Sequence, residues 1–268
     1  MSINITPEDL VLAYRKAKAD AFYEYGNLNL IKFAEFEENL VGNLDLLYNK
    51  LVNWDDIDHE DFVGTFTLVM KECVEEVKDK AFVFFSDNQR NWENIENISV
   101  DFRIIGQHPV EFHVLSSLWI DKVGLFLDDK INIPNSYGCR LNPIDHDDLV
   151  EWKQKETRLV GHFRPYFHDY QRWQYNGINA TENALSDGKK IVAITADVKK
   201  FYHRIDVNFL LSKAFQDYFE FRLSPDRFEL TRILCEAINT WNELIINSES
   251  VPDEYKHRDL AGVPLGLG

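Results

Sequence analysis

An aspartate closes the most apolar short run of the chain. Residues 191–198 read Ile-Val-Ala-Ile-Thr-Ala-Asp-Val, and Asp197 stands where this β-branched run ends. A carboxylate at the end of a buried strand is costly to desolvate unless a cation or hydrogen-bond donors meet it. Two interpretations follow from the residues alone: Asp197 binds Mg²⁺, or it caps the turn after the strand.

The segment that starts at Asp197 resembles a known catalytic motif. It reads Asp-x-x-x-Phe-Tyr-x-x-Ile-Asp and is similar to the first catalytic motif of reverse transcriptases, especially the bacterial retron, group II intron and abortive-infection or defence-associated enzymes. The resemblance implies that Asp197 binds both catalytic metal ions. It also implies that Val198 and Tyr202 lie at the nucleotide, with the Tyr202 ring excluding a 2′-hydroxyl while Phe201 packs in the core.

Two further matches occur in the order that this family shows. Residues 135–141 read Asn-Ser-Tyr-Gly-Cys-Arg-Leu and resemble its fingers motif, which makes Arg140 a candidate for a triphosphate contact. Residues 262–267 read Gly-Val-Pro-Leu-Gly-Leu and resemble the loop that lines the primer and nucleotide site, which implicates Gly262, Pro264 and Gly266. Residue 265 is leucine where many relatives have glutamine, so that polar contact is not carried over.

The family's second carboxylate motif, an aromatic-x-Asp-Asp hairpin, has no counterpart after Gly262 in these 268 residues. Two-metal catalysis needs carboxylates on both sides of the ion pair. We therefore expect sequence beyond residue 268 to complete the Mg²⁺ site, and the 268-residue chain alone to be inactive. The tetrapeptide Phe126-Leu127-Asp128-Asp129 matches the aromatic-x-Asp-Asp pattern but precedes Asp197 in the sequence. We interpret it as a solvated helix end. The alternative is a circularly permuted active site that uses these two aspartates.

The charge distribution points to one basic segment in an acidic chain. The formal net charge is −16, yet residues 151–204 hold ten basic and six acidic residues. Basic side chains mixed with aromatic ones can follow a phosphate backbone, or they can form an ordinary solvated face. The candidates for nucleic-acid contacts are Arg164, Arg172, Lys199, Lys200 and Arg204.

Tyr166, Tyr170 and Trp173 recur at helical spacing in the same segment. Such a stripe is more typical of core packing than of base stacking. His162 and His168 lack a cysteine or acid at ligand spacing, and we interpret both as ordinary histidines.

Apolar periodicity and caps predict an α+β fold. A helix begins at Thr6-Pro7-Glu8-Asp9 and buries Leu10, Tyr14, Ala17 and Ala21; further helices are expected at residues 40–52, 62–85, 109–127, from about 207 to 219, and 225–246. Strands are expected at 191–197 and, as one of two options, at 100–105. The predicted units are a helical N-terminal unit (1–100), fingers (101–190) and a partial right-hand palm (191–268).

The predicted function is RNA-directed DNA synthesis in bacterial antiviral defence, with an RNA template, a DNA product and deoxynucleoside triphosphates as partners. Three widely spaced cysteines, no basic leader and no long apolar run favour a cytoplasmic protein without a membrane span. One alternative is an inactive polymerase-like module that binds RNA or a partner protein, and another is an unrelated helical interaction protein. Oligomerisation stays open.

Overall fold

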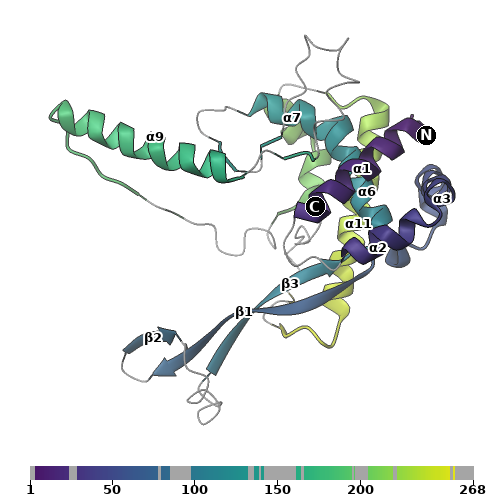
Figure 1. Cartoon of the computed structure of the whole chain (residues 1–268), viewed down its shortest axis with the longest axis horizontal. Coiled ribbons are helices and arrows are strands. Elements are labelled where there is room, and N and C mark those ends of the chain that lie inside the picture. The colour runs from purple at the N-terminus through teal and green to yellow at the C-terminus, as the bar shows by residue number, and fades with distance from the viewer. Residues whose placement is uncertain are drawn as a thin grey trace.

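A computed structural model describes residues 4–23, 29–77, 80–84, 98–131, 136–138, 140–141, 161–163, 166–194, 196, 205–219, 222–253 and 256. The fold is α+β: helices surround a single core, a three-stranded antiparallel sheet extends from it, and one long helix, α9, projects away (Figure 1). Across these residues no helix is both long and apolar enough to cross a membrane.

Helix α1 (Pro7–Tyr23) begins as its sequence predicts. The Thr6 hydroxyl accepts from the Asp9 amide at 3.2 Å, and the Asp9 carboxylate accepts from the Thr6 amide at 3.0 Å. This reciprocal pair satisfies backbone donors that the first turn leaves free. Leu10, Tyr14 and Ala17 are buried on the inner face, together with Ala21.

Helix α2 (Asn29–Glu37) and helix α3 (Leu40–Val52) pack beside α1, and a 3₁₀ turn, η1 (Trp54–Asp56), follows. Helix α3 has the bounds that its pattern predicts. The short helix α4 (His59–Val63) then ends at Gly64, whose φ of 74° is reached without strain by glycine.

The helix predicted over residues 62–85 is wrong. Strand β1 (Thr65–Val77) starts directly after Gly64, and β2 (Lys80–Phe84) returns beside it. Alternating Thr65, Phe66, Thr67 and Leu68 suits a strand, and pairing with β3 (Ile98–Gln107) stabilises it. The strand option at 100–105 is thereby confirmed.

The sheet order is β2-β1-β3, with Phe66 opposite Gly106 and Leu68 opposite Ile104. Strand β3 crosses residue 100, where a boundary between units is expected. Residues from both sides of that position share one core, which extends from Ile5 to Val251.

The helix predicted at 109–127 is confirmed as three consecutive pieces. These are α6 (Val110–Trp119), a π-helical segment η3 (Ile120–Gly124) and α7 (Leu125–Lys130). Helix α6 lies at the centre of the molecule, and its residues Phe112 to Leu118 are all buried.

Near the C-terminus, a 3₁₀ helix η7 (Val207–Leu211) and α10 (Lys213–Tyr218) replace the single helix expected from 207. Ser212 divides them, because its hydroxyl accepts from the Phe215 amide and caps α10. Tyr218, in the last turn of α10, is exposed.

Helix α11 (Pro225–Asn247) begins after Ser224 as predicted. Three indole N–H groups join it to earlier parts of the chain. Trp54 donates to Glu236 at 2.8 Å, Trp119 donates to the Thr231 hydroxyl at 3.0 Å, and Trp241 donates to the Thr65 carbonyl at 3.2 Å. Helix α11 is therefore tied both to the N-terminal helices and to the start of the sheet.

Candidate functional site

Most of the predicted site residues lie outside the described residues. These are Arg164, Asp197, Val198, Lys199, Lys200, Tyr202, Arg204, Gly262, Pro264 and Gly266. Their roles stay predictions, and Arg140 and Arg172 are the two whose surroundings the structure gives.

Arg140 is buried and forms a bidentate ion pair with Asp128. Its Nε donates to Asp128 Oδ1 at 2.8 Å and its Nη2 donates to Oδ2 at 3.1 Å and to the Asp128 carbonyl at 2.9 Å. The side chain is 5% exposed, and Nη1 is buried without a hydrogen-bond partner among the described residues. Asp128 thus fixes the guanidinium plane and leaves one donor for another group.

Asp128 comes from the tetrapeptide 126–129, interpreted above as a solvated helix end. The helix end is correct, since α7 spans these residues. Asp128 itself is not a free surface carboxylate, because it pairs with Arg140. Phe126 lies under the Arg227 guanidinium, 3.8 Å from the ring centroid, in a cation–π contact.

The strand predicted at residues 191–197 is not formed in the part of that range that the structure describes. Residues 191–194 and 196 have neither strand nor helix pattern, and Val192 and Ile194 are each 85% exposed. A β-branched run prefers extended backbone, yet a strand also needs a hydrogen-bonded neighbour. The described sheet consists of β1, β2 and β3 and supplies none here.

Arg172 lies on α9 (Tyr166–Ser186) and is exposed, with Nη1 3.7 Å from Asp169 one turn earlier. Its neighbours Tyr170 and Trp173 are 53% and 51% exposed, with ring centroids 5.6 Å apart. The interpretation of this aromatic stripe as core is therefore wrong for these two residues. They look outward because α9 projects from the body of the molecule (Figure 1).

His162 stands in a buried ionic cluster that the sequence analysis missed. Its Nδ1 lies 2.6 Å from Asp20 Oδ2 and its Nε2 lies 3.3 Å from Asp121 Oδ1, while Lys16 Nζ binds the same Asp121 oxygen at 2.6 Å. Burial opposes the charged imidazole, but the flanking Asp121 and Asp20 carboxylates outweigh it and raise the pKa of His162. Sequence spacing gives no signal, because the members come from α1, η3 and residues 161–163.

Asp20, His162 and Ser117 have the residue types of a nucleophilic triad, with Ser117 Oγ 3.3 Å from His162 Nε2. The arrangement cannot work as one. The imidazole lies between two carboxylates that favour its charged form, so it is no base. Ser117 is 2% exposed and donates to the Ala13 carbonyl at 2.8 Å. The cluster therefore holds α1, α6 and residues 161–163 together.

Two more buried histidines lie where β3 joins α6. His108 Nδ1 lies 2.8 Å from the Val63 carbonyl, which makes this nitrogen the donor. Burial lowers the pKa of His108 to about 4 and that of His113 to about 3. The His108 ring also packs edge-on against Phe112, so its role is structural.

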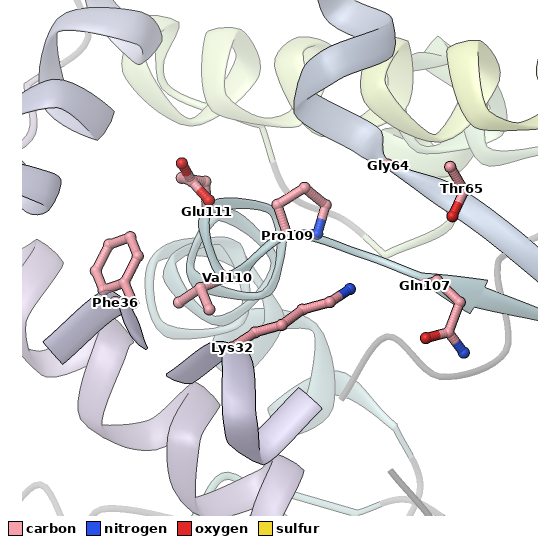
Figure 2. A pocket seen from close by; sticks show the side chains of 8 residues that line it. All are labelled: Lys32, Phe36, Gly64, Thr65, Gln107, Pro109, Val110 and Glu111. Atoms are coloured by element: carbon pink, nitrogen blue, oxygen red, sulfur yellow. The ribbon is translucent and has the colours of Figure 1, made fainter. Parts of the chain in front are cut away.

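A shallow pocket of about 360 Å³ lies beside these histidines, between α2 and the start of α6 (Figure 2). Its lining residues are Lys32, Phe36, Gly64, Thr65, Gln107, Pro109, Val110 and Glu111. The Lys32 amine donates to the His108 carbonyl at 3.1 Å, and burial lowers its pKa. Glu111 lies 3.5 Å from Lys50. The Lys32 amine and the Glu111 carboxylate in the pocket lining thus both interact with other groups of the protein.

Within the described ranges, no group of three or more histidine, cysteine or acidic side chains is arranged to hold a metal ion. Asp197 is outside those ranges. No family model, no curated protein and no solved structure matches the chain.

Proposed function

We propose that the chain is the front part of a reverse-transcriptase-type nucleotidyltransferase of bacterial antiviral defence. One observation carries the proposal: three motifs, at residues 135–141, 197–206 and 262–267, follow one another in the sequence in the family's order, around a β-branched run that ends at Asp197. In this proposal residues 101–190 form fingers and residues 191–268 form part of a palm.

In the proposed reaction, a primer hydroxyl attacks the α-phosphate of a deoxynucleoside triphosphate on an RNA template. Asp197 and further carboxylates hold two Mg²⁺ ions that stabilise the attacking and leaving oxygens. Tyr202 lies against the sugar, and Arg140 contacts the triphosphate. The Asp128 pair orients the guanidinium and leaves Nη1 without a partner among the described residues, which in this proposal gives Arg140 a donor for the triphosphate.

The test is labelled deoxynucleotide incorporation on a primed RNA by the protein as its gene encodes it, including any residues after Gly268. We expect Asp197→Asn to abolish Mg²⁺-dependent incorporation and to leave the thermal midpoint unchanged, because it removes charge and little volume. The matched control is Asp187→Asn, an exposed carboxylate of the same segment that pairs with Lys189. Full activity of Asp197→Asn would refute the proposal.

The second candidate is a polymerase-like module that binds RNA or a partner protein without catalysis. The outward aromatic side chains of α9 favour it, since such side chains are enriched at interfaces. Wild-type protein that binds its partner but incorporates no nucleotide would select this candidate.

A further inference from the structure

Helix α9 carries an apolar face that does not pack on the core. One side carries Phe167, Tyr170, Trp173, Gly177, Ile178, Thr181, Ala184 and Leu185, as 3.6 residues per turn requires. The large members of this apolar face are 48–60% exposed. At the edge of this face Asp169 is buried, and the exposed Asn176 donates to the Tyr137 hydroxyl at 2.8 Å. Most of α9 is exposed, because the helix projects from the body of the molecule, and its apolar face is exposed with the rest (Figure 1).

The apolar face is divided by size. Phe167, Tyr170 and Trp173 occupy the first half of α9, whereas Gly177, Thr181 and Ala184 leave the second half with small side chains on the same stripe. An antiparallel pair of α9 helices centred on Gly177 places Tyr170 opposite Ala184 of the second copy and Trp173 opposite Thr181 of the second copy. Each aromatic ring then meets a small residue, as interdigitated helices require.

Gly177 marks the centre of this arrangement. Glycine in a helix interior costs roughly 0.5–1 kcal/mol relative to alanine, and a Cβ added here meets nothing within 4 Å in the chain itself. Within the described part of the chain, no contact requires the glycine. A close approach of another helix backbone at this position does, because small residues let helix axes come together.

Charge favours a second copy in the antiparallel sense. The chain carries a net charge of −16, so two copies repel except where an uncharged surface meets an uncharged surface. The apolar face of α9 carries no charged residue. Opposed helix dipoles favour the antiparallel orientation.

The exposed apolar area is sufficient for a dimer. Three half-exposed aromatic side chains, with Ile178 and Leu185, leave roughly 500 Å² per copy open on this face. Two copies together would bury about 1,000 Å², which is the lower bound for a specific interface. A nucleic acid fits this face less well, because Arg172, its nearest cation, lies beside Asp169.

We propose that α9 mediates homodimerisation by packing its apolar face antiparallel against α9 of a second copy, with Gly177 at the twofold axis. This inference goes beyond the proposed polymerase function and does not depend on it. It assigns to α9 a contact that the remainder of the described fold does not provide.

Sedimentation equilibrium over a concentration series tests the contact. The wild-type protein should dimerise, and Trp173→Gln should raise the dimer dissociation constant on the order of tenfold or more. Tyr175→Gln is the matched control, because Tyr175 is 65% exposed on the opposite side of α9; it should leave the constant unchanged. A monomeric wild-type protein, or equal effects of both substitutions, would overturn the proposal.

Cysteine cross-linking tests the orientation in a background with Cys73→Ser, Cys139→Ser and Cys235→Ala. Gly177→Cys should form a disulfide dimer on oxidation. Ala184→Cys should not, since in the antiparallel pair its two copies lie about 21 Å apart. Cross-linking of both variants indicates a parallel pair and overturns the proposed geometry. A monomer whose binding of a labelled single-stranded RNA is weakened by Trp173→Gln would instead make the face a nucleic-acid surface.

Discussion

At the scale of single residues, Tyr202 offers the sharpest test of the nucleotide site. A ring against C2′ of the sugar discriminates by shape, so removing it should admit a hydroxyl. We expect Tyr202→Val to raise incorporation of ribonucleotides relative to deoxyribonucleotides, measured by competition on one primed template.

Phe201→Ala is the control for the neighbouring ring. If Phe201 packs in the core, this change should reduce stability by roughly 3–5 kcal/mol and leave sugar preference unaltered. An unaltered sugar preference in a stable Tyr202→Val protein would remove Tyr202 from the site.

Gly106 is a residue whose side chain must be absent. A Cβ at this position would lie 1.9 Å from Nε2 of His108. We expect Gly106→Ala to destabilise the protein by about 1–3 kcal/mol, because the buried ring has to move. Urea unfolding measures the change.

The same substitution in a His108→Ala background separates this contact from a general effect of alanine on the strand. Without the ring, Gly106→Ala should add little further loss. Equal losses in both backgrounds would mean that the ring is not what excludes a side chain.

At the scale of elements, local chemistry predicted the helices whose signals lie within them. Thr6 and Asp9 cap α1, and the bounds of α3 and α11 follow from their apolar periodicity and, for α11, Pro225. The sequence predicted α6, η3 and α7 as one continuous helix, because a π-helical segment such as η3 keeps the direction of the helix axis.

The elements that were mispredicted depend on contacts far along the chain. Strand β1 is stabilised by β3, and its apolar residues fit helical spacing when they are read alone. Residues 191–194 show the reverse case, in which strand propensity exists without a neighbouring strand. The partners of Arg140 and His162 were not predictable for the same reason, since Asp128 and Asp20 approach only through tertiary packing.

At the scale of the whole molecule, two groups of buried histidines should give stability a maximum near neutral pH. The pKa values of His108 and His113 fall to about 4 and 3 on folding, from 6.5. The unfolded chain therefore binds more protons below pH 6.5, and their contribution is lost as pH falls toward 4 and then 3. Each unit of pKa difference corresponds to about 1.4 kcal/mol.

His162 has the opposite sign. Its pKa is raised above 6.5 on folding, so its contribution is complete below that pH and is lost as pH rises through the folded value. The thermal midpoint, measured between pH 4 and pH 9, should be highest near neutral pH and should decrease toward both ends of this range. His162→Gln should flatten only the alkaline side, and an unchanged alkaline slope would contradict the assignment.

The three indole bridges to α11 also set an order of events during synthesis. Thr65, Trp54 and Trp119 are made long before residues 225–247, to which they bind. At about 5–20 residues per second, Trp54 waits on the order of ten seconds or more for the end of α11. During that interval the inner face of α6 lacks its last covering helix. We therefore expect this apolar face of the growing chain to stay open to solvent or to chaperones until translation has passed Trp241.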